Sequence, residues 1–319
     1  MKEFSFDLIV KERLHEYVAF LKDFDERSNK IVLQNPNFFS HRLHWDEHPF
    51  CYSLRDLTNL ETLEGIEFAL RSCLVFSYSN EHWGMIESYW NSGPEIFDKK
   101  SNVDLARKDL FQIYLKKGCT LKDSLKLADS VGIKLSKRIY KRFKVRKYTI
   151  MELTRILDEH YKKLGFYKVK YACKNAARYL AMTFPELVDP NSPVTGGPGH
   201  FLGLSYIFND NNIKTPVDSF YARLETGGLI PENDSRVTTW INYMGILNGI
   251  TIDIFDRQHW LNNEDKVCFF YKLQQFKNKE RKVRNKKNMN AILPEWFSLK
   301  PGENIYSNLY KKQTKLFKS

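Results

Sequence analysis

A glycine-rich run, Gly196-Gly197-Pro198-Gly199, most constrains what this chain can fold into. Gly197 and Gly199 flank a proline, so the backbone can turn sharply there and leave N–H groups uncovered by side chains. The residues that follow are dense enough in apolar side chains for a buried helix: Phe201, Leu204, Tyr206, Ile207 and Phe208. Because N–H groups at a helix start bind anions without a charged side chain, we expect an anion site at this turn.

A second helix start is predicted shortly after this run. Thr215 can cap it, and Pro216 occupies the first helical position, where proline is favoured. Asp218 then falls in the first turn, where the helix dipole favours an ionised carboxylate. Arg223 lies about one turn further on, within reach of a phosphate or an acidic partner. The plainer alternative is a simple turn followed by an aspartate that only caps its helix.

In order and spacing, these residues resemble the helix-hairpin-helix DNA glycosylase superfamily. Its pattern is Leu-Pro-Gly-Val-Gly, a helix, and then Val-Asp-Thr-His before an arginine. Here Gly-Gly-Pro-Gly comes first and a helix follows it. Next comes Val217–Phe220, which contains Asp218, and then Arg223. Upstream, 165–170 is similar to the family's Gly-hydrophobic-Tyr-x-x-Lys segment. The resemblance covers roughly 147–250, more weakly 66–90. It implies a mainly α, bilobal helix-hairpin-helix DNA glycosylase-like fold.

The chain also departs from that family. Where strand-cleaving relatives carry a Schiff-base lysine it has Phe201, which argues against lyase activity. Beyond Cys173 it has only Cys268, so the four-cysteine iron–sulfur cluster of some relatives is not expected, and no cofactor is predicted. Its Gly-Pro-Gly hairpin resembles a branch linked with phage thymine hypermodification, the alpha-glutamyl/putrescinyl thymine pyrophosphorylases or amino acid:DNA transferases. The branch implies joining an amine or amino acid to pyrophosphorylated 5-hydroxymethyluracil in DNA.

The resemblance also implies roles for individual residues. Asp218 and His200 are the expected catalytic residues. The expected DNA-binding residues are Gly197, Gly199, Arg223, Tyr78, Asn80, Lys168 and Lys170. Two alternatives stay open: a monofunctional DNA N-glycosylase without lyase activity, and a non-catalytic DNA-binding protein of the same fold.

Two further clusters have competing interpretations. Tyr78 and Asn80 fall where relatives place side chains that fill the gap left by an extruded base, but a helix-ending aromatic cluster in the core is the alternative. His41, His44 and His48 have spacings that suit a metal on a helix. The following proline and the aromatic surroundings argue against a regular helix there, and no cysteine joins the set. We therefore predict no metal.

Charge and cysteine usage bear on partner and compartment. The 319 residues include 50 basic and 38 acidic side chains, a net charge of +12, which favours a polyanion such as double-stranded DNA. Many soluble proteins from AT-rich genomes are also rich in lysine, so the genome's base composition alone would produce the same basic net charge. Five cysteines form no Cys-x-x-Cys pair, and from the residue pattern we expect neither a signal peptide nor an apolar run of membrane-spanning length. We expect a cytoplasmic location, in the host cell if the gene is a phage gene, with no membrane partner.

The expected organisation is an N-terminal helical and aromatic extension over 1–60, a core over 61–265, and a basic C-terminal extension over 266–319. Within the core, 98–147 is predicted to be an inserted basic helical hairpin. Thr120 starts its first helix, Gly132 breaks it, and the second helix carries the basic residues. The alternatives there are a DNA-reading helix-turn-helix module and a solvated basic face that touches backbone phosphates at most.

Overall fold

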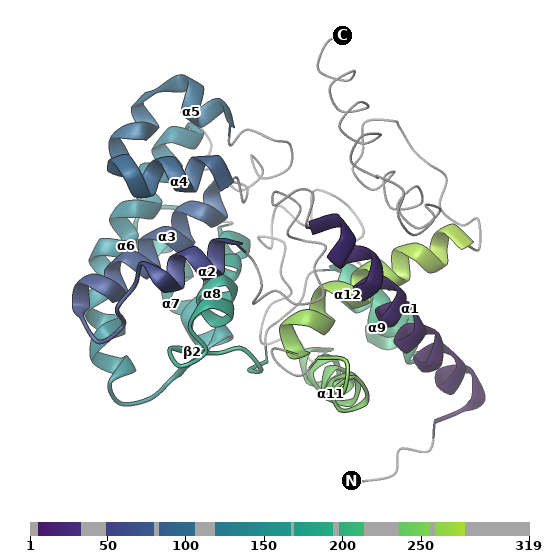
Figure 1. Ribbon diagram of the computed structural model, residues 1–319. Helices are drawn as coiled ribbons and strands as arrows, with labels where there is room; N and C mark the ends of the chain where they lie inside the picture. The colour runs from purple at the N-terminus through teal and green to yellow at the C-terminus, as the bar shows by residue number, and fades with distance from the viewer. Residues whose placement is uncertain are drawn as a thin grey trace.

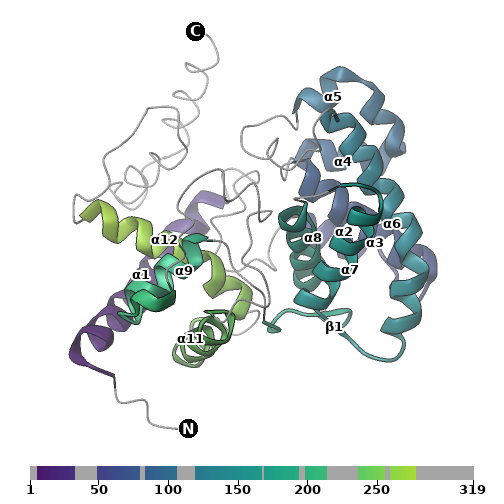
Figure 2. The same ribbon diagram turned by 180° about the vertical axis from the view of Figure 1, so that it is seen from behind.

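The computed structural model describes residues 6–32, 49–79, 83–105, 119–166, 169–193, 198–213, 236–255 and 259–277. These residues are mainly α-helical, which confirms the predicted class at that level. Among them, the only strands are two residues long. The helices pack as two groups, seen side by side in Figure 1 and from behind in Figure 2. None of the described helices has the length and apolarity needed to cross a membrane.

The first group is built around α3, whose residues from Ser72 to Tyr78 are all buried. Helices α6 and α8 pack directly against α3, and α7 packs on α8. A short parallel pair of strands, β1 and β2, ties the start of α7 to the end of α8. The elements of this group are α2 (Pro49–Asp56), α3 (Leu63–Tyr78), α4 (Trp83–Ser92), η3 (Gly93–Asp98), α5 (Lys100–Leu105), α6 (Leu121–Phe143), β1 (Tyr148–Thr149), α7 (Ile150–Lys163), α8 (Lys170–Thr183) and β2 (Val188–Asp189).

The second group brings the N-terminal helix together with the later part of the chain. Its elements are α1 (Leu8–Val32), α9 (Pro198–Ile207), η5 (Asn211–Ile213), α11 (Arg236–Ile250) and α12 (His259–Lys277). Helix α12 packs on α1, α9 and α11, and α1 also contacts α9 (Figure 1). Arg13 of α1 donates to the carbonyl of Tyr206 and lies 4.3 Å from the centroid of its ring.

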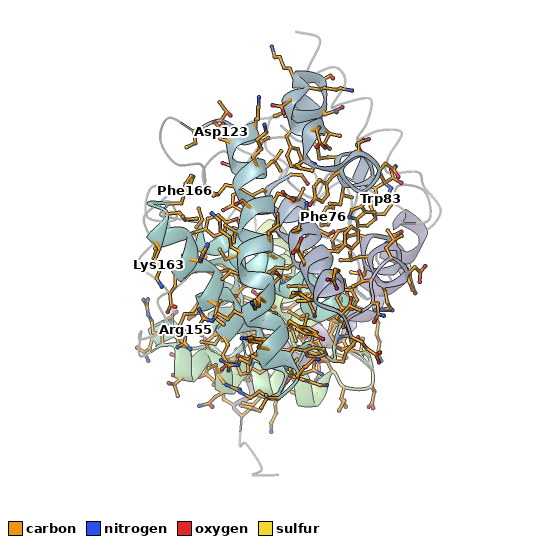
Figure 3. The ribbon with its side chains drawn as sticks, turned by 90° about the vertical axis from the view of Figure 1, so that its left-hand side faces the viewer. Phe76, Trp83, Asp123, Arg155, Lys163 and Phe166 are labelled. Atoms are coloured by element: carbon orange, nitrogen blue, oxygen red, sulfur yellow. The ribbon has the colours of Figure 1, made fainter. Side chains whose placement is uncertain are left out.

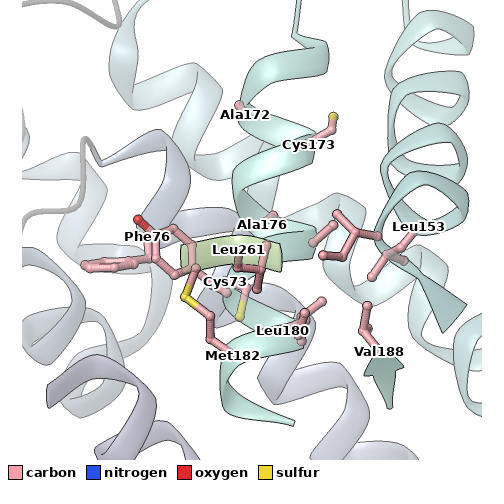
Figure 4. Packing of buried hydrophobic residues seen from close by; sticks show 14 of the residues in the cluster. Cys73, Phe76, Leu153, Ala172, Cys173, Ala176, Leu180, Met182, Val188 and Leu261 are labelled. Carbon is pink, nitrogen blue, oxygen red and sulfur yellow. The ribbon is translucent and has the colours of Figure 1, made fainter. Parts of the chain in front are cut away.

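The two groups share one apolar core. In the cluster of Figure 4, Leu261 of α12 belongs with Ala176 and Leu180 of α8 and with Cys73 and Phe76 of α3. All five side chains are at most 1% exposed. Buried apolar contact of this kind is the main favourable term in folding, so it holds α12 against α8.

The turn expected at Gly132 is absent: α6 runs unbroken from Leu121 to Phe143, so the predicted hairpin is one helix. A glycine inside a helix costs only ~1 kcal/mol relative to alanine, which packing can offset. Here a Cβ on Gly132 would lie 2.5 Å from Cγ and 2.9 Å from Cα of Arg71 in α3. The glycine therefore permits a close approach of α6 to α3 and does not end the helix.

Replacing Thr120 with alanine is expected to destabilise the protein by about 1 kcal/mol, because this residue caps α6. Its hydroxyl accepts from the Asp123 amide at 3.2 Å, and the Asp123 carboxylate accepts from the Thr120 amide at 2.9 Å. Urea denaturation would measure the change, with Ser130→Ala in the same helix as the control. Equal midpoints for the two variants would show that the cap contributes nothing.

Candidate functional site

A set of buried charged side chains lies where the two groups of helices meet. Lys174 and Arg178 come from α8, Glu264 from α12 and His200 from α9. The side chains of Lys174 and Glu264 are fully buried, whereas those of Arg178 and His200 are 7% and 13% exposed. We call these four residues the ionic cluster.

Glu264 is the centre of the ionic cluster. The Lys174 ammonium donates a hydrogen bond to Oε1 of Glu264. Nε of Arg178 lies 3.7 Å from Oε2, and Nδ1 of His200 lies 3.9 Å from Oε1. Because Lys174 and Arg178 are four residues apart on α8, their side chains extend from the same face of that helix. Buried charges are tolerated only when paired in this way.

The approach of α9 to α12 places His200 beside Glu264. A Cβ on Gly203 would lie 2.4 Å from Cγ1 and 2.5 Å from the carbonyl oxygen of Val267. Only a residue without a side chain fits at that distance. His200 and Glu264 each precede these residues by three positions, so they lie about one turn along the same contact.

A hydrogen-bond network holds the neighbouring residue of α12. Tyr17 of α1 donates its hydroxyl proton to Oδ1 of Asn263 at 2.7 Å. Nδ2 of Asn263 donates to Oδ1 of Asn248 at 2.9 Å and to Oγ1 of Thr251 at 2.8 Å. Burial raises the pKa of the Tyr17 hydroxyl well above its usual value, so it remains a donor. The network fixes the backbone position from which Glu264 projects.

Phe201 occupies an aromatic stack next to the ionic cluster. Its ring lies 5.9 Å from that of Trp240 at an interplanar angle of 17°, and Trp240 contacts Trp260 edge-on at 5.7 Å. Phe201 is fully buried. The position at which the resembling lyases carry a nucleophilic lysine is therefore a core aromatic here.

The ionic cluster brings two cationic side chains and an imidazole together around one carboxylate. Arginine and lysine together suit phosphate oxygens, the first through a planar fork and the second as a point charge. Cationic side chains at the first turn of α9 are the chemistry that suits an anionic ligand.

The structure places only some of the predicted site residues. His200 belongs to the ionic cluster, Gly199 is the second residue of α9, and Lys170 is the first residue of α8. The buried helix predicted after the glycines is present as α9. The remaining predicted positions lie outside the described residues: Gly197, Asp218, Arg223, Asn80, Lys168, and the histidines at 41, 44 and 48. Among the residues that are described, no three His, Cys, Asp or Glu side chains form a metal-binding group.

Tyr78 lies in the core of the first group. It is the last residue of α3, its side chain is 6% exposed, and its ring centroid lies 5.8 Å from that of Tyr161 in α7. Burial raises the pKa of its hydroxyl well above the usual value. This is the placement expected for a helix-ending core aromatic, and the DNA contact of Tyr78 stays a prediction.

Sequence reasoning missed Lys174, Arg178 and Glu264. No motif contains them, and Glu264 is 90 residues from Lys174 in the sequence. The available signal was local: the two basic residues stand at helical spacing in a helix that also carries many small and apolar residues. Two basic residues on a helix face that must be buried imply a buried acidic partner, but they do not show which residue that partner is.

No protein-family model, curated protein or solved structure matches this chain.

Proposed function

We propose that this protein is a DNA-modifying enzyme with a helix-hairpin-helix architecture. Its substrate would be a thymine-derived base rotated out of the duplex, activated as pyrophosphorylated 5-hydroxymethyluracil. The enzyme would join an amine or amino acid to that base without a cofactor. The observation that supports this is the ionic cluster at the start of α9, a helix that begins within the glycine-rich run.

In the proposed reaction, the amine nitrogen attacks the methylene carbon attached to C5 of the base. A C–N bond forms as the C–O bond to pyrophosphate breaks, and pyrophosphate leaves with the electron pair. The amine loses a proton, which Asp218 would accept or orient. His200, at the first turn of α9, would stabilise the charge that develops on the leaving oxygen.

The exposed fractions of the four side chains support His200 as the residue that first contacts the leaving group. Its side chain is 13% exposed, the highest value in the ionic cluster, whereas the Lys174–Glu264 pair is fully buried. Hydrogen bonds made in a site with little water are stronger than the same bonds in bulk solvent. The buried pair would then hold α8 and α12 in place while His200 contacts the anion.

The test is to incubate the protein with DNA containing pyrophosphorylated hydroxymethyluracil and a mixture of amines, and to weigh the digested nucleosides by mass spectrometry. We expect a nucleoside that has lost pyrophosphate and gained an amine. His200→Ala and Asp218→Asn should each reduce the rate by roughly 10²–10³-fold with DNA binding retained. His15→Ala, at an exposed position of α1, is the control and should leave the rate unchanged.

Other outcomes would replace the proposal. Full activity in Asp218→Asn would remove the assigned role of that carboxylate. A free base and an abasic site would identify a monofunctional glycosylase, an alternative that Phe201 in place of the lyase lysine also suits. DNA binding with no altered nucleoside would identify a non-catalytic protein.

A further inference from the structure

Helices α6 and α7 carry an exposed basic surface away from the ionic cluster. It consists of Lys134, Lys137, Arg138 and Lys141 of α6 together with Lys163 of α7, and all five are exposed. We call these residues the α6–α7 basic surface. Figure 3 faces α6 and shows Lys163 projecting from α7 beside it.

The four α6 residues form one stripe. Their positions follow the spacing i, i+3, i+4 and i+7, which places them on one side of a helix. The residues between them, Leu135, Ser136 and Ile139, are buried on the side that packs against α3. Because α6 is one continuous helix, the stripe is a single straight row of charges about 10 Å long.

Other basic residues of these helices have acidic partners. Arg142 and Arg146 pair with Glu152 at 2.5 and 2.7 Å, and Lys162 pairs with Asp158 at 2.7 Å. By contrast, no acidic side chain in the part of the chain that the structure describes lies within ion-pair distance of the α6–α7 basic surface. Within the described residues, these exposed charges therefore have no ion-pair partner.

The two helices contribute to one region of positive potential. His160 of α7 has a pKa below its usual value because burial disfavours the charged imidazole. Lys134, Lys163 and Arg138 lower that pKa further by repelling a proton. Charges from both helices thus act at one point, as expected for a surface that attracts a polyanion.

We propose that the α6–α7 basic surface binds the sugar-phosphate backbone of duplex DNA. The inference rests on the DNA partner in the proposed function but not on its chemistry. A row of about 10 Å laid along the duplex covers about three base-pair steps of ~3.4 Å, over which both strands present phosphates. Lysine ammonium groups contact phosphates as point charges and carry no base information, so the surface positions the duplex without selecting a sequence.

The test compares two variants that lose the same charge. One carries Lys134→Gln, Lys137→Gln, Arg138→Gln and Lys141→Gln, and the control carries Lys11→Gln, Lys22→Gln, Lys99→Gln and Lys100→Gln at exposed positions elsewhere. Fluorescence anisotropy with a random-sequence duplex would give affinity as a function of salt. We expect the slope of log K against log salt to be shallower by about three in the surface variant, since each lost contact removes ~0.9. Binding at ~0.1 M salt should weaken on the order of 100-fold, whereas the control should bind nearly as wild type does.

Identical salt slopes in the two variants would overturn the inference, as would binding of the wild type to anionic lipid vesicles but not to duplex DNA. If the fourfold variant unfolds, Lys137→Gln and Lys141→Gln alone should each reduce the slope by about one. The nucleoside assay on the same samples separates the two proposals. Altered slopes without base modification would contradict the proposed enzyme alone, and base modification with unaltered slopes would contradict this surface alone.

Discussion

Replacing Glu264 with alanine is expected to lower the free energy of unfolding by about 3–5 kcal/mol. The substitution would leave the fully buried ammonium of Lys174 and the nearly buried guanidinium of Arg178 without the carboxylate they contact. Desolvated cations that lose their counter-charge are among the most destabilising changes in proteins. Because Glu264 links α12 to α8, the loss should appear in the cooperative unfolding of both groups of helices.

Urea denaturation followed by circular dichroism would measure this loss. Glu159→Ala is the matched control, since its partner Arg155 lies 4.0 Å away and both side chains are more than half exposed. Such pairs contribute less than ~1 kcal/mol. The double variant Lys174→Met, Glu264→Leu should recover only part of the stability, because it removes the Lys174 charge together with that of Glu264 but leaves Arg178 without this carboxylate. A Glu264→Ala variant as stable as the control would refute the ionic cluster as a structural centre.

The second large effect is expected at Gly203, where alanine should destabilise the protein by about 2–3 kcal/mol. The added methyl group would meet both a side-chain carbon and the backbone of Val267 at 2.4–2.5 Å, so α9 and α12 would have to separate. That separation would also move His200 away from Glu264, because these two residues lie one turn from Gly203 and Val267 on the same two helices. We therefore expect lower activity as well as lower stability.

Gly245→Ala is the control for Gly203→Ala. Gly245 is also inside a helix, but nothing lies within 4 Å of a Cβ built there. Alanine at that position should be neutral or stabilising by up to ~1 kcal/mol, because it restricts the unfolded chain and favours the helix. Thermal unfolding of the two variants should therefore move in opposite directions. A shift of the same sign and size in both would mean that the close α9–α12 contact does not exist in solution.

Local sequence signals predicted many of the helices. Thr120 starts α6 as predicted, and the apolar residues that follow Gly199 lie in the buried helix α9. Caps, turns and apolar periodicity depend on residues a few positions apart, so they can be recognised without knowing the fold.

One prediction about a helix boundary was wrong for a tertiary reason. Gly132 was expected to break a helix, but its missing side chain accommodates Arg71 of a different helix. Helix α12 runs unbroken from His259 to Lys277, across the boundary expected at 265/266 between the core and the C-terminal extension. Its early turns bury Asn263 and Glu264, and buried polar residues conceal the apolar pattern from which a helix is predicted.

The sequence by itself determined that the protein is mainly helical and strongly basic, because helix formation depends on local spacing and net charge is a sum over residues. It also located the start of α9 and the glycines before it. Only the tertiary structure decided which buried charges meet. Lys174 and Glu264 are 90 positions apart, and their pairing depends on how α8, α9 and α12 pack. Pairing across helices is selected by the free energy of the packed core, which no local pattern specifies.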